Sequence, residues 1–204
     1  MSETDSQATQ ARRAQTLPEI GELQKALRDQ TIAVVGNGSN LLKARNGDLI
    51  ENHDVVVRMN RGLPPPGLFP NLGSRTDLWS FSGMINIAAL VDYHGRFGAR
   101  WNLWLTEYWG YAHPVVRRGV FVAPPESYRE LRSKLQTSPS TGCLTLDFLI
   151  RTTKFKSMTV LGFDFFATGN FNRSVTVQTR AAEREKDYLL SLIEGNRDRV
   201  TRIT

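Results

Sequence analysis

The 204-residue sequence has few of the features that mark secreted, membrane-spanning or nucleic-acid-binding proteins. It has a single cysteine, Cys143, so no disulfide can form within the chain and a reducing compartment such as a bacterial cytosol is expected. No apolar run is long enough to cross a bilayer, and the first 16 residues are polar, without the apolar core of a signal peptide. The net charge of +6 is small and scattered, which predicts no nucleic-acid partner and suits a small anionic ligand. A cytoplasmic protein is therefore expected.

The pattern of apolar and polar residues predicts one α/β domain over residues 17–204, preceded by a disordered leader over residues 1–16. Continuous apolar runs such as TIAVV are typical of strands buried in a parallel sheet, and they alternate with helical patterns. This alternation favours a Rossmann-like sandwich of helices on a mostly parallel central sheet. Strands are expected at 31–35, 55–59, 77–81, 103–107, 120–122 and 158–163, with an edge strand at 200–203; helices at 17–29, from 41 to 47, and at 84–93, 124–135, 144–151 and 180–194; and a loop at 61–73.

The stretch TIAVVGNGSNLL, residues 31–42, predicts a strand, a tight turn and the start of a helix, which is a common place for an anion to bind. The dinucleotide fingerprint G-x-G-x-x-G fits poorly, because its third glycine position holds Leu41. The second strand ends in Asn60-Arg61 rather than in an acidic residue, although an arginine there would favour NADP. The sequence contains no G-x-x-x-x-G-K-[ST] loop. An NADP-dependent oxidoreductase therefore stays a distant alternative.

Three polar loops are expected to meet at one end of the sheet. GNGSN follows the first strand, NRG follows the second, and SPSTG precedes an apolar helix. Because ligands of open α/β sheets bind beyond the carboxyl ends of the strands, all three loops are expected to face one crevice.

Taken in order, VVGNGSNL, HDVVVRMNRG and SPSTG leading into VLGFDFF resemble the motifs of the eukaryotic-type sialyltransferase family, glycosyltransferase family 29, and its bacterial relatives. GNGSNL through RMN is similar to the family's large sialyl motif, PSTG through GFD to its small one, and NLGSRTDL to the strand after the large motif. The resemblance implies a GT-A-like single domain that transfers a sialic-acid-like sugar from a CMP-sugar, CMP-sialic acid by default, to a glycan hydroxyl. It also implies that neither a metal nor a cofactor is required.

The resemblance and the chemistry of the side chains together predict the donor site. The turn at residues 37–40 is expected to meet the phosphate of CMP through amides and backbone N–H groups, with Asn40 as the main contact. Asn60 is expected to bond the ribose or the sugar, and residues 140–142 to present hydroxyls and N–H groups at a helix N-terminus. Each residue also has a purely structural interpretation, as a helix cap or a turn former. The predicted donor-binding residues are Asn37, Gly38, Ser39, Asn40, Asn60, Ser140, Thr141, Gly142, Gly162 and Phe163.

The resemblance leaves the catalytic base open. The reaction it implies is an inverting displacement, in which a base takes the proton of the acceptor hydroxyl. In the family a histidine lies five positions ahead of a glutamate at the start of the last helix; aligned on Glu183, that position holds Gln178, which cannot accept a proton. The expected base is then His113, with His94 and Asp164 as weaker candidates. The alternative is a protein that binds a CMP-sugar with little or no turnover.

An aromatic loop at residues 104–113 could offer ring faces to the acceptor sugar, although its first residue, Trp104, alternates within a strand and is expected in the core.

The family's vertebrate members tie the large motif to the small one by a disulfide. Cysteines are absent here from Ile32 and from the region before Met158, so packing is expected to join the two motifs.

Overall fold

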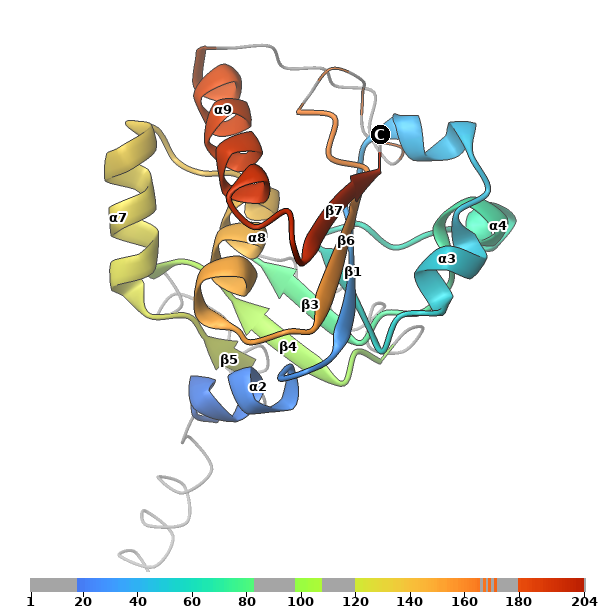
Figure 1. Cartoon of the computed structure of the whole chain (residues 1–204), viewed down its shortest axis with the longest axis horizontal. Helices are drawn as coiled ribbons and strands as arrows, with labels where there is room; N and C mark the ends of the chain where they lie inside the picture. The colour runs from blue at the N-terminus through green and yellow to red at the C-terminus, as the bar shows by residue number, and fades with distance from the viewer. Residues whose placement is uncertain are drawn as a thin grey trace, which may run out of the picture.

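The computed structural model describes residues 18–82, 98–107, 120–165, 167, 169, 171 and 180–203. Its centre is a seven-stranded sheet in the order β5-β4-β3-β2-β1-β6-β7, in which every recorded pairing is parallel (Figure 1). The strands are β1 (Thr31–Val35), β2 (Val55–Met59), β3 (Leu78–Phe81), β4 (Trp101–Trp104), β5 (Val120–Val122), β6 (Ser157–Leu161) and β7 (Val200–Ile203). The α/β class and the edge position of the last strand are confirmed, and the sheet is parallel throughout rather than mostly so.

The continuous apolar runs identified the central strands well. All five residues of β2 are buried, and so are four of the five in β1, because helices cover both faces of the sheet. Two strands differ most from their predicted bounds. β4 runs from Trp101 to Trp104 and not over 103–107, and β6 ends before Gly162, whose φ of 70° takes the chain out of the extended region.

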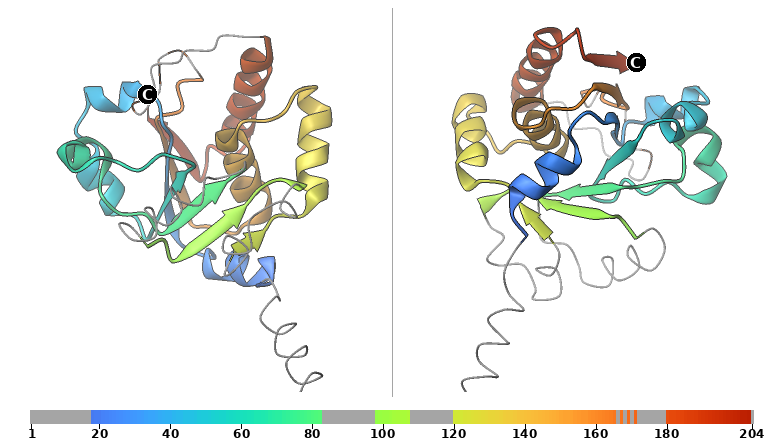
Figure 2. Two further views of the ribbon diagram at one scale, coloured as in Figure 1. Left: turned by 180° about the vertical axis from the view of Figure 1, so that it is seen from behind. Right: turned by 60° about the horizontal axis from the view of Figure 1, so that its bottom comes forward.

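Helices cover the two faces unequally (Figures 1 and 2). One face carries α7 (Pro125–Leu135), α8 (Thr141–Thr152) and α9 (Arg180–Glu194). Leu23 of α2 (Ile20–Ala26) and Leu27, the C-cap of that helix, join the same hydrophobic core. The other face carries the 3-10 turn η1 (Ser39–Lys43) with α3 (Gly47–Glu51), and η2 (Pro66–Leu68) with α4 (Phe69–Leu72). No helix in these described ranges is both long enough and apolar enough to cross a bilayer.

The short elements on the second face correct the sequence-based expectation. The helix expected from Leu41 to Gly47 is instead a 3-10 turn followed by a helix that starts at Gly47, and the expected loop at 61–73 contains η2 and α4. Gly47 is required where α3 meets α4, since a Cβ there would lie 2.3 Å from the carbonyl oxygen of Phe69. The helix expected at 84–93 lies outside the described residues.

Parallel pairing of β1 with β6 joins the two motif-bearing halves of the chain. Ile32 is the register partner of Met158, so the adjacent backbones are hydrogen-bonded at the position where the family's vertebrate members were expected to carry a disulfide. Cys143 is buried in α8, away from this pair in the sequence. Strand pairing within the sheet therefore joins the large-motif and small-motif segments, where packing alone was expected to do so.

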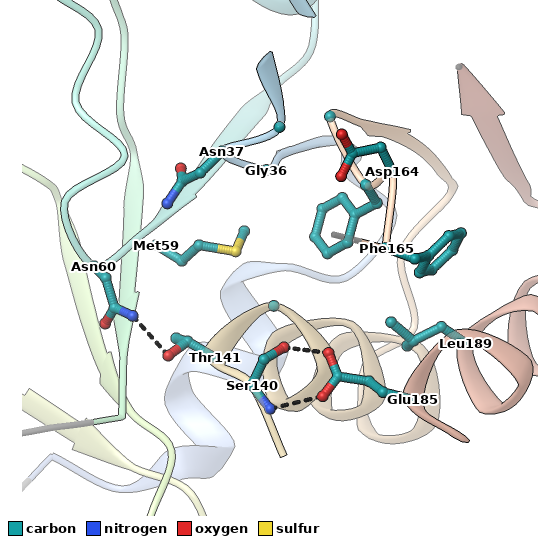
Figure 3. Close-up of a pocket in the computed structure, with 14 residues that line it drawn as sticks. Gly36, Asn37, Met59, Asn60, Ser140, Thr141, Asp164, Phe165, Glu185 and Leu189 are labelled. Carbon is teal, nitrogen blue, oxygen red and sulfur yellow. Dashed lines mark hydrogen bonds between the residues drawn. The ribbon is translucent and has the colours of Figure 1, made fainter. Parts of the chain in front are cut away.

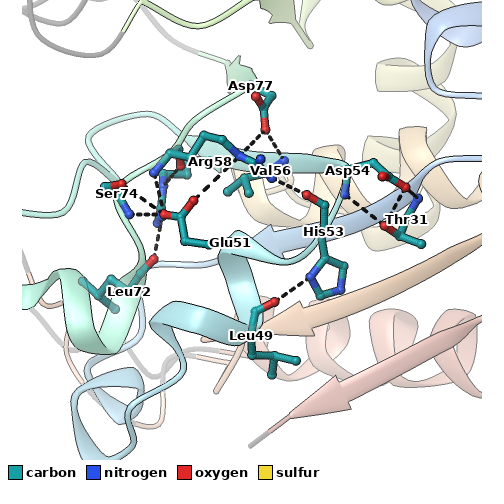
Figure 4. A network of polar contacts seen from close by, with 11 residues as sticks. Thr31, Leu49, Glu51, His53, Asp54, Val56, Arg58, Leu72, Ser74 and Asp77 are labelled. Carbon is teal, nitrogen blue, oxygen red and sulfur yellow. Dashed lines mark hydrogen bonds and ion pairs between the residues drawn. The ribbon is translucent and has the colours of Figure 1, made fainter.

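A network of polar contacts fixes the loop between β2 and β3 (Figure 4). Arg58 is fully buried, and its guanidinium donates to the carbonyl oxygens of Arg75 at 2.9 Å and Leu72 at 2.6 Å. Glu51 accepts from the backbone N–H groups of Ser74 and Arg75. These contacts give two nitrogens of the buried guanidinium and two loop carbonyls their hydrogen bonds, and so hold the end of β2 in place.

Gly162 is expected to tolerate no larger side chain. Its positive φ is strained for other residues, and a Cβ there would lie 2.5 Å from Cδ1 of Leu41. We expect Gly162→Ala to lower the free energy of unfolding by about 2–5 kcal/mol, as measured in urea. Gly21→Ala is the matched control, because no atom lies within 4 Å of a Cβ at that helical position and the change is expected to be neutral or slightly stabilising. Equal effects of the two substitutions would contradict this account.

Candidate functional site

A pocket lies where the strand order of the sheet reverses. From β1 the chain moves outward through β2, β3, β4 and β5, and then returns to place β6 on the other side of β1. Such a switch point opens a crevice at the carboxyl ends of the two central strands, where open α/β sheets bind ligands. The described residues that line the pocket are Gly36, Asn37, Gly38, Met59, Asn60, Ser140, Thr141, Gly142, Gly162, Phe163, Asp164, Phe165, Glu185 and Leu189 (Figure 3). The three polar loops therefore do face one crevice.

The turn after β1 is bonded to the turn after β6 across this switch point. Gly36 N–H donates to the Leu161 carbonyl at 2.7 Å, Gly38 N–H to the Gly162 carbonyl at 3.1 Å, and Ser39 N–H to the Gly169 carbonyl at 2.8 Å. A Cβ at Gly36 would lie 2.5 Å from the Gly162 oxygen, so glycine is needed for the two backbones to approach. These three N–H groups have acceptors within the protein, so of the predicted turn at residues 37–40 the N–H groups of Gly38 and Ser39 are already used.

Asn40 and Ser39 do not line the pocket, in contrast to their predicted roles as phosphate contacts. The Ser39 hydroxyl donates to the Gly169 carbonyl. The side-chain oxygen of Asn40 points toward Gly38, 2.6 Å from where a Cβ would stand, and it has no recorded partner among the described residues. The side-chain oxygen of Asn40 thus lies next to Gly38, at the border of the lining and not within it.

Asn37 and Asn60 supply the amide groups that line the pocket. Asn60 has a φ of 48°, a left-handed conformation that asparagine tolerates, and its Nδ2 donates to the Thr141 hydroxyl at 2.7 Å. Trp79 Nε1 donates to the Asn60 carbonyl at 2.8 Å and so fixes the turn from the other face of the sheet. The side-chain oxygen of Asn37 is buried beside Gly62, 2.5 Å from where a Cβ would stand. Glycine at 62 therefore leaves room for Asn37.

The N-terminus of α8 opens into the pocket. Ser140 is its N-cap, and the hydroxyl accepts from Cys143 N–H at 3.1 Å. No described residue is recorded as an acceptor for the N–H groups of Thr141 and Gly142, as is usual for the first turn of a helix. A Cβ at Gly142 would lie 2.9 Å from the ring of Phe163, so glycine here lets the ring pack on the helix end. This end can accept a single anionic group.

Glu185 holds the cap residue in place from α9. Its carboxylate accepts from Ser140 N–H at 2.9 Å and from the Ser140 hydroxyl (Figure 3). The side chain is only 6% exposed, and this burial raises the pKa of Glu185 above its usual range, against the lowering effect of the two hydrogen bonds. Glu185 was not among the predicted site residues. Its spacing of four and eight residues from the buried Leu189 and Ile193 is the sequence signal that could have identified it.

The other predicted catalytic residues are not brought into the described pocket. Glu183 is exposed on α9 and does not line the pocket, although Glu185 two residues later does. His113 and Gln178, with the weaker candidate His94, lie outside the described residues. Asp164 lines the pocket. Trp104 is buried, at 2% exposure, as expected.

The charge of the described lining is acidic. It contains two carboxylates, Asp164 and Glu185, and none of its members is a lysine, arginine or histidine. Within the described part of the chain no group of three or more His, Cys, Asp or Glu side chains is arranged to hold a metal ion. An anionic ligand here would be bound by N–H and hydroxyl groups rather than by ion pairs.

The raised pKa of Glu185 predicts a pH dependence of stability. A carboxyl group that is harder to ionise in the folded state favours folding while protonated. This advantage is lost as the pH rises from about 4.3, the value expected in the unfolded chain, through the raised native pKa. We therefore expect wild type to lose stability relative to Glu185→Gln across that window in urea unfolding. Glu183→Gln controls for loss of an exposed acid on the same helix; parallel curves for wild type and Glu185→Gln would contradict the assignment.

Comparison with known proteins supports one family. The model of glycosyltransferase family 29 (sialyltransferase) matches residues 3–95, less than half of the chain, which include β1 to β3. No curated protein matches the sequence. The structure is similar to that of a mammalian sialyltransferase in complex with Gal-beta-1-3GalNAc-ortho-nitrophenol, with 18% identity and a TM-score of 0.59 over 88% of this chain and 71% of that chain.

A second crystal structure of a mammalian sialyltransferase gives 19% identity and a TM-score of 0.58 over 86% of this chain and 69% of that one. Identities this low establish the shared fold, and the family match covers the strands that carry the large motif. The partial sequence match and the common fold together make the chain similar to glycosyltransferase family 29, the sialyltransferases.

Proposed function

We propose that the protein transfers a sialic-acid-like sugar from a CMP-sugar to a glycan hydroxyl, with inversion at the anomeric carbon. The observation that carries the proposal is the convergence of the turns after β1, β2 and β6 with the N-terminus of α8 on one pocket at the switch point. These are the segments that resemble the family's large and small motifs. CMP-sialic acid is the expected donor.

The phosphate of the donor would lie at the N-terminus of α8. Thr141, Gly142 and the amide of Asn60 line that end of the pocket, where Figure 3 shows Asn60 beside Thr141. The positive end of the helix dipole stabilises negative charge there, and the charge on the phosphate increases as CMP leaves. A nucleoside diphosphate would bring more negative charge to a lining with two carboxylates and, in its described part, no basic side chain. A single phosphate suits this site better.

We propose a GT-A-like, metal-independent enzyme on the same grounds. The first turn of α8 offers N–H donors to the leaving phosphate, so that the protein itself supplies the stabilisation of the developing charge. The proposal therefore assigns no role to a metal or to a bound cofactor.

The dinucleotide alternative is disfavoured by the turn after β1. A dinucleotide fold places a pyrophosphate at the N-terminus of an α-helix after this turn, whereas the chain here forms only a five-residue 3-10 turn. Leu41 stands at the third glycine position and packs against Gly162. Tighter binding of NADP than of CMP in calorimetry would overturn this part of the proposal.

The position of Glu185 changes the alignment of the last helix with the family. If Glu185 rather than Glu183 is the family's glutamate, the position five residues earlier is Arg180, the first residue of α9, and not Gln178. A guanidinium stays protonated and cannot act as a base. Under either alignment the base must come from elsewhere, and His113 remains the proposed candidate. The same observation favours a second function, a CMP-sugar-binding protein with little turnover.

Asn60 and Asn40 give a matched pair of substitutions for the donor site. Asn60 lines the pocket and Asn40 does not. We expect Asn60→Ala to weaken CMP binding by about 1.5–3 kcal/mol through loss of a hydrogen bond to a charged group. Asn40→Ala is expected to have a smaller effect. Isothermal titration calorimetry with CMP measures both, and a larger loss for Asn40→Ala would show that the phosphate lies behind the turn instead.

Turnover distinguishes an enzyme from a binding protein. We expect wild type to hydrolyse CMP-sialic acid, or to transfer its sugar, at a measurable rate. A histidine near neutral pH can accept the proton, and alignment on Glu185 puts the family's histidine at position 180, so we expect Arg180→His to raise that rate more than Gln178→His. Released CMP is the readout. CMP binding without turnover in wild type and in both variants would support the binding protein and reject the transferase.

A further inference from the structure

We propose that Glu185 takes up a proton when an anionic nucleotide binds, and that this proton turns the hydroxyl of Ser140 from the carboxylate toward the ligand. The inference deepens the proposed function and rests on it, since it takes the phosphate of the ligand to lie at the N-terminus of α8. It makes Glu185 a positioning residue that acts through Ser140. It also predicts that the affinity for the donor rises as the pH falls.

The hydroxyl of Ser140 lines the pocket, but it has no proton left for a ligand while Glu185 is ionised. Its oxygen accepts from Cys143 N–H at 3.1 Å, and its single O–H donates to Oε1 of Glu185 (Figure 3). The other carboxylate oxygen, Oε2, accepts from Ser140 N–H at 2.9 Å. Because an ionised carboxylate can only accept, it orients the hydroxyl away from the ligand.

The ionised carboxylate also opposes an anion by its charge. Glu185 lines the same pocket as Thr141 and Gly142, so the carboxylate and a bound phosphate would share one end of α8. Glu185 is only 6% exposed, and water screens the repulsion between two negative charges poorly at a buried site. Burial already raises the pKa of Glu185 against its two hydrogen bonds from Ser140, and a second negative charge nearby raises it further.

One proton on Oε1 removes both obstacles. Oε2 has to remain an acceptor because the backbone N–H of Ser140 can only donate, whereas the hydroxyl that faces Oε1 can reverse its direction. A proton from solvent therefore binds Oε1, and the new O–H donates to the Ser140 oxygen, which has a second acceptor position for Cys143 N–H. The proton of the Ser140 hydroxyl then points to the ligand, and the charge of Glu185 is neutralised.

The surroundings of Glu185 supply no counter-charge in the described part of the chain. Both of its recorded hydrogen bonds come from Ser140, and no ion pair is recorded for it there. Asp164 is a second acid in the lining, so its contribution to any pH dependence has to be separated from that of Glu185. The charged and titratable groups on the surrounding elements are Cys143, Asp147 and Arg151 of α8, Lys134 of α7, Tyr188 of α9, Asp164 after β6 and Arg202 of β7.

Binding measured across pH tests the coupling, with Glu185→Gln as the decisive variant. Glutamine offers an oxygen to Ser140 N–H and an amide N–H to the Ser140 hydroxyl, so it reproduces the protonated acid without a charge. The probe is the methyl ester of cytidine 5′-monophosphate, which lacks the second ionisation that a phosphate monoester has near about pH 6. Neutral cytidine is the reference ligand. Glu183→Gln, exposed on the same helix, is the matched control.

We expect wild type to bind the methyl ester about 10-fold more tightly at about pH 5 than at about pH 8, since uptake of one proton changes affinity by at most about 10-fold per pH unit. Glu185→Gln is expected to bind with nearly constant affinity, close to that of wild type at the lower pH, and Glu183→Gln to follow wild type. Cytidine is expected to show no such dependence. Melting temperatures verify that each variant is folded.

A measurement on wild type alone makes the test independent of the variants. Calorimetry in two buffers of different ionisation enthalpy is expected to detect net proton uptake with the methyl ester and none with cytidine. Absence of proton uptake, or a wild-type affinity that does not change with pH, rejects the coupling. Parallel pH curves for wild type and Glu185→Gln reject it too, because the proton then binds elsewhere, although the nucleotide site stands. If wild type binds neither ligand, the proposed function fails and this inference fails with it.

Discussion

The close approach of the turns after β1 and β6 is the constraint on which the site depends. The two backbones are hydrogen-bonded across the switch point, and Gly36 and Gly162 allow a separation that side chains would prevent. This contact brings the large-motif and small-motif segments together, and parallel pairing of the strands beneath holds them in register. The contact uses the N–H groups of Gly36, Gly38 and Ser39, whereas no described acceptor is recorded for Thr141 and Gly142 N–H at the N-terminus of α8. Gly36 and Gly162 thus allow the turns after β1 and β6 to approach each other, and this role accounts for them better than phosphate binding does.

The sequence was most informative about the buried strands. Apart from Thr31 and Arg58, the runs TIAVV and VVVRM are apolar at consecutive positions, which is typical of a strand covered on both sides. The edge strand and the last helix were also placed correctly. The short elements on the second face were missed for a physical reason. The turns at 39–43 and 66–68 are 3-10 turns of five and three residues, too short for a helical period to show, and glycine at 47 resembles a helix breaker rather than a helix start.

The site was predictable in part. The convergence of three polar loops followed from sheet topology alone, because parallel strands end at one edge. Asn40 is absent from the described lining, and a sequence does not show which groups of the turn after β1 will be used by a distant turn, here the turn after β6. Glu183 was chosen between two acids on one helix without regard to the face of that helix, and it is exposed and absent from the described lining. Glu185 shares the side of α9 that carries Leu189, and tertiary packing against α8 makes it a partner of Ser140.

The central claim is that one pocket at the switch point binds a cytidine monophosphate group, with its phosphate at the N-terminus of α8. A crystal structure with CMP bound tests this most directly. The account predicts phosphate oxygens within hydrogen-bond distance of Thr141 and Gly142 N–H, and the nucleoside beside Phe163 and Asp164. Nucleotide bound elsewhere on the sheet, or bound with its phosphate against the carboxylate of Asp164, would contradict it.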